Sequence, residues 1–302
     1  MLFPLELKLW MILVNWIGMS CIPGSEGYNT KLSFNDTDDS DSESDSDEAD
    51  INLEAIAKKF GLEHADNAST ELCYKEEKSC PLSKVLKAKY LDGPNVYVDF
   101  TSAQLTWRQT HGGDEALVRA VGVSGPYKPY VIDATGGFGT DAYILVSYGC
   151  KVRVFEKHPL VASLLEDGIR RGGERLGPQF RKNIQFQFGD SLAYLKSLNR
   201  SDMNQTAIIP DVIYLDPMFP KTKKSALVKK HIRFLQNVLT PDPSNDEDLM
   251  RVALNTARRR VVVKRQKSAP CLGGVSTKTF IKSNRYRFDI YVTNVKSKFG
   301  NW

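Results

Sequence analysis

Short apolar runs alternate with helical stretches over residues 126–302, and this alternation dominates the hydrophobic pattern of the chain. Strands are predicted where short runs consist mainly of apolar residues, and helices where apolar residues recur every three or four positions. Strands separated by helices are typical of βαβ units and a parallel sheet. The expected strands are 130–134, 151–155, 184–188, 212–215 and 260–264, the expected helices are about 141–148, 159–171, 191 onward, 225–239 and 246–258, and a polar turn between 277–282 and 287–292 predicts a β-hairpin.

Residues 1–125 have a different pattern and divide into two further zones. Residues 51–125 predict a small α+β subdomain, with helical spacing over 51–60 and about 115–121 and strand-like alternation over 96–100. Residues 1–50 combine an apolar start with the acidic run DTDDSDSESDSDEAD at 36–50, which holds nine acids and no base. Such a run cannot bury apolar surface, so we expect a disordered linker there.

The composition of the 302-residue chain is that of a globular protein, with 41% hydrophobic and 25% charged residues, which excludes fibrous and fully disordered proteins. Its formal net charge of +5 hides an uneven distribution, because setting aside the nine acids of the acidic run leaves +14 on the rest of the chain. Residues 221–267 carry thirteen Lys or Arg against four acids, a net charge of +9. A positive surface of this size attracts polyanions such as nucleic acids.

Cysteine and histidine usage argues against a disulfide framework and against a metal site. The five cysteines are scattered without a CxxC pair, and the four histidines form no HxxxH spacing. Residues 9–21 are apolar and are compatible with a signal peptide, with an N-terminal strand or with a start codon placed too far upstream. No run reaches the roughly 20 apolar residues that cross a bilayer, so we expect a cytoplasmic protein without membrane partners.

A glycine-rich turn lies between the strand at 130–134 and the next helix, in the sequence VIDATGGFGTDA at 131–142. Gly137 and Gly139 allow the backbone to turn sharply and to approach a ligand closely. Glu156, 17 residues beyond Gly139, lies at the tip of the next strand, where a carboxylate can accept both hydroxyls of a ribose. Together these features predict a cofactor that contains adenosine.

Two such cofactors fit the turn. The G-x-G-x-x-A spacing of residues 137–142 matches the dinucleotide fingerprint of NAD-dependent oxidoreductases. However, Asp133 ends the strand beside the turn, where its carboxylate would repel a pyrophosphate and attract the ammonium of a methionine moiety. Asp133 therefore favours S-adenosylmethionine, and a tight turn that binds no ligand is the remaining alternative.

Asp190 and Ser191 follow the strand at 184–188 in the same way. A carboxylate or hydroxyl at this place can bind the adenine amino group across the cofactor crevice. Asp-Ser is also a good N-cap for the helix that begins there. The two roles are compatible with each other.

The segment YLDPMFP at 214–220 predicts the chemistry. A buried strand ends in Asp216 and Pro217 at the carboxyl edge of the sheet, where open α/β sheets bind ligands. The Asp216 carboxylate and the Pro217 carbonyl can accept the two N–H bonds of an aryl amine and direct its lone pair at a methyl group. Phe219 can stack on the extruded base. The segment resembles the (D/N/S)-P-P-(Y/F) motif of methyltransferases that modify exocyclic amino nitrogens, with Met218 in place of the second proline.

Basic residues beside this motif predict a surface that holds RNA by its phosphates. They comprise Lys221, Lys223, Lys224, Lys229, Lys230, Lys264 and Arg265. A solvated helix face is the alternative interpretation of such a run. A second candidate is WRQTHGG at 107–113, where Arg108 is expected to contact RNA or the segment to close over the cofactor, with a plain turn as the alternative.

With these motifs in place, the chain resembles the bacterial family of small-subunit rRNA guanine-N2 methyltransferases called RsmJ. The matching stretches are GLEHADN (61–67), YVDF (97–100), residues 131–159, VIYLDPMFPKTKKSALVKK (212–230), RRVVVKR (259–265) and RFDIYV (287–292). They span about residues 51–295, and DPMFP followed by SALVKK is the most distinctive of them.

The resemblance implies a Rossmann-like class I methyltransferase domain over residues 126–302. Its implied reaction is the transfer of a methyl group from S-adenosylmethionine to the 2-amino group of a guanine in 16S rRNA of the 30S subunit. It places cofactor contacts on Thr140, Asp141, Glu156, Lys157, Asp190, Ser191 and Asp216. Thr140 and Lys157 stand where the family commonly has Arg, and Asp190 replaces a small polar residue.

Three other functions stay open on the sequence alone. An N-methyltransferase that acts on DNA adenine or on a protein amide would use the same Asp-Pro motif. An NAD-type oxidoreductase would use the same glycine turn. A non-catalytic RNA-binding protein would use the basic surface without the cofactor.

Overall fold

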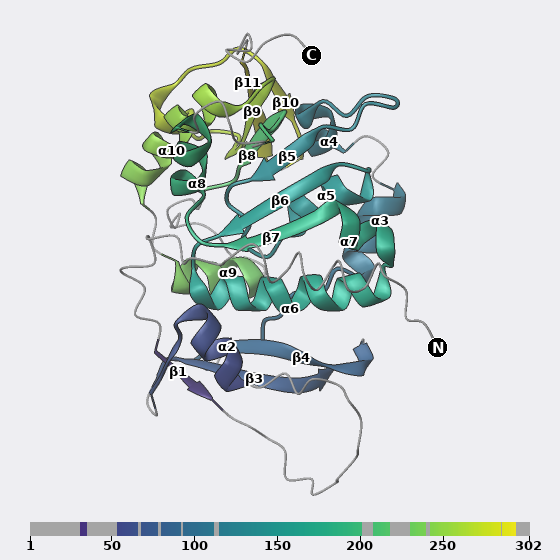
Figure 1. Cartoon of the computed structure of the whole chain (residues 1–302), viewed down its shortest axis with the longest axis vertical. Helices are drawn as coiled ribbons and strands as arrows, with labels where there is room; N and C mark the ends of the chain where they lie inside the picture. The colour runs from purple at the N-terminus through teal and green to yellow at the C-terminus, as the bar shows by residue number, and fades with distance from the viewer. Residues whose placement is uncertain are drawn as a thin grey trace, which may run out of the picture.

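The computed structural model describes residues 31–34, 53–65, 68–77, 80–91, 93–111, 115–200, 208–217, 230–239, 242–284 and 286–293. The strands in these ranges are β1 (Lys31–Phe34), β2 (Glu63–His64), β3 (Thr70–Glu77), β4 (Cys80–Tyr90), β5 (Tyr130–Asp133), β6 (Lys151–Glu156), β7 (Ile184–Phe188), β8 (Val212–Leu215), β9 (Arg260–Gln266), β10 (Phe280–Lys282) and β11 (Tyr286–Val292). The helices are α2 (Leu53–Phe60), α3 (Ala103–His111), α4 (Ala116–Val121), α5 (Thr140–Ser147), α6 (Pro159–Arg175), α7 (Pro178–Asn183), α8 (Ser191–Arg200), α9 (Lys230–Val238), α10 (Pro243–Thr256) and the 3-10 helix η1 (Leu272–Gly274). They build a large sheet and a small sheet with helices around and between them (Figure 1).

The large sheet has the strand order β10-β11-β9-β8-β5-β6-β7. Strands β5 to β9 run parallel to one another, whereas β11 pairs antiparallel with both β9 and β10. Parallel neighbours need crossover connections, which the chain makes with its helices. The sequence prediction of an α/β fold with a parallel core and a C-terminal hairpin is therefore confirmed, and β7 and β8 have the predicted bounds.

The central strands of the large sheet are buried on both faces. Successive residues of a strand point to opposite faces, so in β8 Val212 and Tyr214 join one core cluster while Ile213 and Leu215 join another. Helices α5 and α6 contribute to the first cluster, and α8 and α10 contribute to the second. Because the central strands β5, β8 and β9 are buried on both faces, they are mainly apolar in the sequence.

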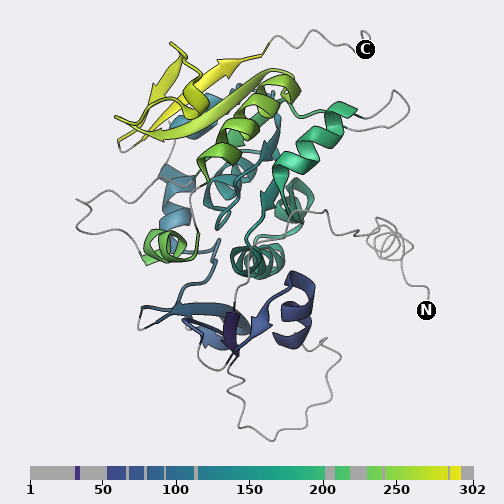
Figure 2. The ribbon, with the colours of Figure 1, turned by 90° about the vertical axis from the view of Figure 1, so that its left-hand side faces the viewer.

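The small sheet has the order β2-β1-β3-β4, and α6 lies between it and the large sheet (Figures 1 and 2). Strand β1 is parallel to β2 and β3, and β3 forms an antiparallel hairpin with β4. Leu72 and Leu86 of this hairpin belong to the same core cluster as Leu160 of α6. The small sheet therefore shares one continuous core with the large sheet.

A buried ion pair joins α6 to the small sheet. Asp167 Oδ2 accepts a hydrogen bond from Arg171 Nε at 2.8 Å and a second one from the backbone N of Leu86 in β4 at 3.2 Å. Arg171 also donates to the carbonyl oxygen of Val98. Since both charged side chains are buried, each depends on these partners to offset its lost hydration.

The strand expected at residues 96–100 is reduced to a single bridge between Val96 and Ala88. The segment instead crosses α6, where the side chain of Val98 lies so close to Gly168 that a Cβ there would fall 2.3 Å from Val98 Cγ1. The Val98 carbonyl is taken by a side chain and not by a neighbouring strand. At residues 96–100 the alternation of apolar residues therefore reflects burial against a helix and not pairing within a sheet.

Some elements of residues 1–125 pack elsewhere than the three zones expected from the sequence suggest. Strand β1 lies within residues 1–50 but belongs to the small sheet, and the acidic run at 36–50 lies outside the described residues. Helices α3 and α4 fall within residues 51–125, yet α3 packs on α5 and α4 packs on β9, β10 and β11. The segment at 107–113, for which a plain turn was the alternative interpretation, is helical up to His111, where α3 ends.

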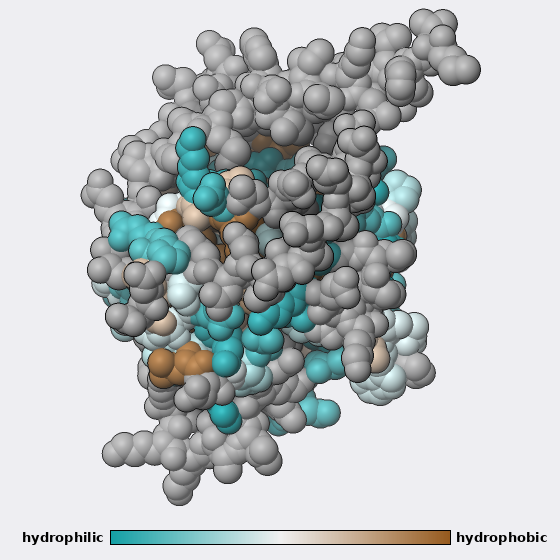
Figure 3. Space-filling view, turned by 90° about the horizontal axis from the view of Figure 1, so that it is seen from below, coloured by the Kyte–Doolittle hydropathy of each residue, from teal (hydrophilic) through white to brown (hydrophobic). Residues whose placement is uncertain are grey.

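Viewed from below, the described surface is mainly hydrophilic, with apolar residues in small separate areas (Figure 3). In the part of the chain that the structure describes, no helix combines the length and apolar character needed to cross a bilayer. Within the same ranges, no three His, Cys, Asp or Glu side chains are grouped so that they could hold a metal ion.

We expect Asp167→Ala to lower the free energy of unfolding by about 3 to 5 kcal/mol, because it leaves the Arg171 guanidinium buried without its carboxylate. Urea unfolding measures this loss. Glu174→Ala is the matched control on the same helix, since its ion pair with Arg170 is 51% exposed on the carboxylate side and should contribute less than about 1 kcal/mol. Equal losses in the two variants would contradict the assignment of the buried pair.

Candidate active site

The glycine turn between β5 and α5 is closed on one side and open on the other. Gly136 donates its N–H to Phe155 O at 2.7 Å, and a Cβ on Gly136 would fall 2.5 Å from Val154 Cγ1. The Gly137 backbone has φ +53°, and a Cβ there would meet nothing within 4 Å. The turn is thus pressed against β6 on its inner side, while its outer side lines an open cavity.

Gly139 holds the turn in shape without lining the cavity. Its φ of +68° is in the left-handed region that favours glycine, and a Cβ there would fall 2.6 Å from Leu165 Cδ1 of α6. Its N–H donates to Gly136 O at 2.8 Å. The sequence prediction for Gly139 as a cofactor contact is replaced by a role in closing the turn and starting α5.

Glu156, the last residue of β6, fixes the tip of that strand to the turn. Its Oε2 accepts from Gly137 N at 2.8 Å, and its Oε1 accepts from His158 N at 2.8 Å. Burial raises the pKa of Glu156, although both backbone hydrogen bonds oppose that shift. Each carboxylate oxygen has a second acceptor site, so Glu156 can still receive hydroxyl groups from the cavity.

Asp133 ends β5 and is only 2% exposed. Its Oδ1 accepts from Thr135 N at 3.2 Å. Burial raises the pKa of Asp133 to about 8, and the nearby carboxylates of Asp141 and Asp216 act in the same direction. Asp133 is therefore a mostly neutral acid near pH 7 that gains from a cation placed beside it.

Asp190 and Ser191 stabilise the junction between β7 and α8. Asp190 Oδ1 accepts a hydrogen bond from Leu192 N at 2.9 Å. This is the N-cap role that the sequence suggested for the Asp-Ser pair. Ser191 Oγ donates to Ala134 O at 2.8 Å and so ties this junction to the glycine turn. Both residues also line the cavity.

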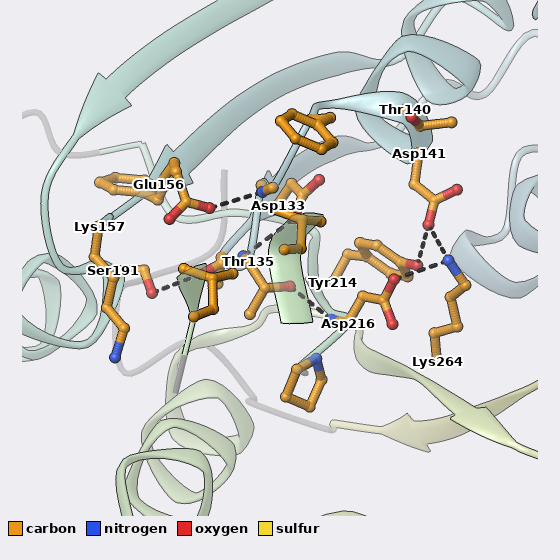
Figure 4. A pocket seen from close by; sticks show the side chains of 18 of the residues that line it. Asp133, Thr135, Thr140, Asp141, Glu156, Lys157, Ser191, Tyr214, Asp216 and Lys264 are labelled. Carbon is orange, nitrogen blue, oxygen red and sulfur yellow. Dashed lines mark hydrogen bonds and ion pairs between the residues drawn. The ribbon is translucent and has the colours of Figure 1, made fainter. Parts of the chain in front are cut away.

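The second half of the site gathers around Lys264 (Figure 4). Its Nζ donates to Asp141 Oδ2 at 2.7 Å and to Asp216 Oδ2 at 2.8 Å. Tyr214 Oη donates to the same Oδ2 of Asp141 at 2.7 Å. The backbone N of Asp216 donates to Thr135 Oγ1 at 2.6 Å, which connects this cluster to the glycine turn.

The charges in this cluster compensate one another. Burial raises the pKa of Asp216 while the Lys264 ammonium opposes the shift. Burial works against ionisation of Asp141 too, but Lys264 and the hydrogen bonds from Lys264 and Tyr214 hold its pKa below the usual value. Burial would lower the pKa of Lys264, but the two carboxylates raise it well above its usual range. Lys264 is thus a permanent cation between two acids.

The acids described above, Ser191, Tyr214 and Lys264 all border one cavity of about 430 Å³, a size typical of a small-molecule site. Its lining includes the predicted residues Arg108, Asp133, Gly137, Thr140, Asp141, Glu156, Lys157, Asp190, Ser191, Asp216, Pro217 and Lys264. Further lining comes from α3, from the region of α9, from α10 and from the start of β11, through Gln104, Leu235, Gln236, Leu239, Asn245, Asp246, Leu249 and Tyr286.

The described residues that were predicted to contact RNA lie in different surroundings. Lys264 points into the cavity and is 16% exposed, and its ammonium is bound by Asp141 and Asp216. Arg265 is 9% exposed and donates from Nε to Pro270 O, so neither side chain projects from the outer surface. For these two residues the expected RNA contact is withdrawn. Arg108 lines the cavity and forms an ion pair with Glu115 at 3.0 Å.

The remaining predicted residues cannot be placed. Phe219, Lys221, Lys223, Lys224 and Lys229 lie outside the described residues. Lys230 begins α9, but its side chain is likewise outside the description. Their roles stay predictions from the sequence.

Sequence reasoning missed Tyr214 and Thr135 as members of the site. The signal for Tyr214 was present, because it stands two positions before Asp216 and therefore points to the same face of the sheet. The contributions of Gln104, Leu235 and Asn245 carried no such signal, because only the folded chain brings their helices to the cavity.

The parallel strand order, the glycine turn after β5, the acid at the tip of β6 and the Asp-Pro after β8 define a class I S-adenosylmethionine-dependent methyltransferase. The cavity fits that cofactor: it offers an open backbone at Gly137, acceptors on Glu156 and a buried acid at Asp133.

Comparison with known proteins gives the family. A family described as "Putative SAM-dependent methyltransferase" matches residues 55–293. Ribosomal RNA small subunit methyltransferase J of Erwinia tasmaniensis is 39% identical over 251 residues, which cover 79% of this chain and 92% of the relative, and that of Cronobacter sakazakii is 40% identical over 247 residues with the same coverage. The crystal structure of the SAM-dependent methyltransferase NGO1261 from Neisseria gonorrhoeae superimposes with a TM-score of 0.63 at 29% identity and covers 90% of this chain and 100% of its own. The chain belongs to the family of ribosomal RNA small subunit methyltransferase J.

We expect cofactor binding near pH 7 to release about one proton, because the ammonium of the ligand converts the neutral acid of Asp133 to its carboxylate. Affinity for S-adenosylhomocysteine should accordingly rise from about pH 6 to about pH 8, the pKa of Asp133, and then level off. Calorimetry in buffers of different ionisation enthalpy measures the proton release.

Asp133→Asn should bind the ligand more weakly and release no proton. The exposed carboxylate of Asp248 provides the matched control, and Asp248→Asn should behave like the wild type. Proton release that persists in the Asp133→Asn protein would show that another group is responsible.

Proposed function

We propose that this protein transfers a methyl group from S-adenosylmethionine to the exocyclic 2-amino group of a specific guanine in 16S rRNA of the small ribosomal subunit, in the cytoplasm. Action on small-subunit rRNA is supported by the relatives, which are named for it and which this chain matches over nearly their whole length. The choice of an exocyclic amine rests on the Asp-Pro group after β8.

The observation that carries the proposal is the placement of Asp216. Its carboxylate borders the cofactor cavity, its backbone is fixed to Thr135 of the glycine turn, and its Oδ2 is held by Lys264. A donor group of the substrate that reaches Asp216 therefore comes close to the place where the reactive end of the cofactor would lie. Asp133 on the neighbouring strand would hold the ammonium of that same end.

An aryl amine needs such a site because its lone pair is delocalised into the ring. Acceptance of its two N–H bonds by the Asp216 carboxylate and the Pro217 carbonyl directs the lone pair outward and stabilises positive charge as it develops on nitrogen. S-adenosylmethionine supplies an electrophilic methyl group on a sulfonium. The amine nitrogen forms the new N–C bond, the S–C electron pair stays on sulfur, and the nitrogen then loses one proton to water. No strong base is required, because the nitrogen becomes acidic as the bond forms.

The other cofactor contacts follow from the same arrangement. Glu156 would accept the ribose hydroxyls, and Asp190 or Ser191 would meet the adenine amino group, with Thr140, Asp141 and Lys157 bordering the same cavity. Phe219 would stack on the extruded base. Lys221, Lys223, Lys224, Lys229 and Lys230 would contact phosphates and position the RNA, with Arg108 at the cavity.

Asp216→Ala should abolish methyl transfer, with a loss of at least about 100-fold, while binding of S-adenosylhomocysteine remains measurable. The assay follows radiolabelled methyl transfer to small ribosomal subunits that lack the modification, with nucleoside analysis of the product. Asp248→Ala, a surface carboxylate outside the cavity, is the matched control and should retain activity.

The same assay offered free 16S rRNA, DNA and protein decides the substrate. N2-methylguanosine in the rRNA is the expected product. Methyladenine in DNA, or a methylated protein amide, would replace the proposed substrate by another amine. Full activity of Asp216→Ala would overturn the mechanism.

A further inference from the structure

Lys264 connects two parts of the active site that come from distant segments. Asp141 stands in the first turn of α5, directly after the glycine turn, whereas Asp216 follows β8 on the acceptor side. The Lys264 ammonium lies 2.7 Å from the first and 2.8 Å from the second. One buried cation thus spans the boundary between the cofactor side and the acceptor side of the cavity.

The arrangement follows from the alternation of the strands. Val262 of β9 belongs to the core cluster on the face covered by α5, and Lys264, two positions further, points to the same face. Tyr214 of β8 lies on that face as well and is hydrogen-bonded to Asp141. A lysine at the carboxyl end of β9 is thereby directed at the acids of α5 and β8.

Other charged and aromatic groups surround the ammonium. The ring of Tyr286 at the start of β11 has its centroid 4.9 Å from Lys264 Nζ. Arg108 of α3 approaches Asp141 Oδ1 at 3.9 Å. Asp133 of β5 interacts with Lys264 electrostatically, and Arg265, next to Lys264 in β9, acts in the same way on Asp216. Among these, only Lys264 forms a hydrogen bond that the structure records to the side chain of Asp216.

The contact with Lys264 gives the two carboxylate oxygens of Asp216 different roles. Oδ2 accepts from Lys264, which leaves Oδ1 to accept an N–H of the substrate. A carboxylate held at one oxygen cannot rotate freely, so the direction of the second oxygen is fixed before the substrate arrives. An acceptor that is already oriented needs little reorganisation during the reaction, so less free energy is spent on moving it.

We propose that Lys264 is a positioning residue that acts through Asp216, keeping its carboxylate ionised and aimed at the acceptor amine while anchoring it to α5. This proposal rests on the proposed function, because it assigns to Asp216 the role of accepting the amine. It replaces the phosphate contact that the sequence suggested for Lys264.

The charge balance gives the proposal a measurable consequence. Without the ammonium, burial and the repulsion from Asp141 would both favour protonation of Asp216, and a protonated carboxyl is a poorer acceptor for the amine. The pH below which kcat falls should therefore rise. Removal of the Asp141 charge should do the opposite, because one source of repulsion on Asp216 disappears while Lys264 remains.

The experiment measures kcat against pH for methyl transfer to small ribosomal subunits that lack the modification, at saturating S-adenosylmethionine. In Lys264→Met we expect kcat at pH 7 to fall by about 100-fold and the acidic limb of the profile to move up by about 1 to 3 pH units. Lys264→Arg keeps the charge, and its acidic limb should stay near that of the wild type even if kcat falls. Asp141→Asn should move the limb to lower pH.

Lys151→Met is the matched control, since Lys151 is exposed at the start of β6, the end of that strand opposite the cavity. It should leave the profile unchanged. Thermal unfolding and binding of S-adenosylhomocysteine establish that each variant is folded. If Lys264→Met does not fold, the direction of the shift in Asp141→Asn still tests the proposal.

An acidic limb that stays in place in both Lys264→Met and Asp141→Asn would overturn the positioning role, and so would shifts of the same sign in the two variants. Neither result would affect the proposed function, provided that the wild type forms N2-methylguanosine. Absence of that product with the wild type would overturn the proposed function instead.

Discussion

Burial of the large sheet on both faces is the constraint on which the rest of the structure depends. Strands β5, β6, β8 and β9 carry apolar side chains toward both helical layers, and apart from Arg153 in β6 their charged side chains stand at or near the strand ends. Because the strands are parallel, their carboxyl ends meet at one edge. Asp133, Glu156, Asp216 and Lys264 are gathered there for that reason.

Asp133, Asp141, Glu156 and Asp216 are among the carboxyl groups that line the cavity, and they would repel one another if all were ionised. The fold resolves this in two ways. Asp133 is held largely neutral by burial, with its pKa raised to about 8, while Asp141 and Asp216 share the ammonium of Lys264. Glu156 is stabilised by backbone N–H groups of the turn and of His158. The site therefore combines one largely neutral acid, Asp133, with one carboxylate, Asp216, that Lys264 holds at one oxygen.

The small sheet stabilises α6, which in turn packs on the strands that lead to the cavity. Its hairpin packs on α6, and the Asp167–Arg171 pair binds β4 and the Val98 backbone to that helix. The opposite side of α6 lies against β6 and β7, whose carboxyl ends reach the cavity, through contacts to both strands. The small sheet thus helps to hold the scaffold beneath the cofactor side, and it shares the core of the large sheet.

Most of the elements from β5 to β11, and the polar residues at the strand ends, follow from the sequence alone, because buried strands leave short apolar runs that end in polar groups. The helices α7 and η1 were not predicted. The turn after β5 is also predicted from the sequence, because glycine readily adopts the positive φ that Gly137 and Gly139 have here. Amphipathic alternation was less reliable at 96–100, where burial against α6 imitates a strand. The folded chain alone shows that Lys264 lies between two acids, that Arg265 is buried, and that α3, α9 and α10 complete the cavity. Those facts depend on which distant segments meet in space, and a local pattern of charge does not contain that information.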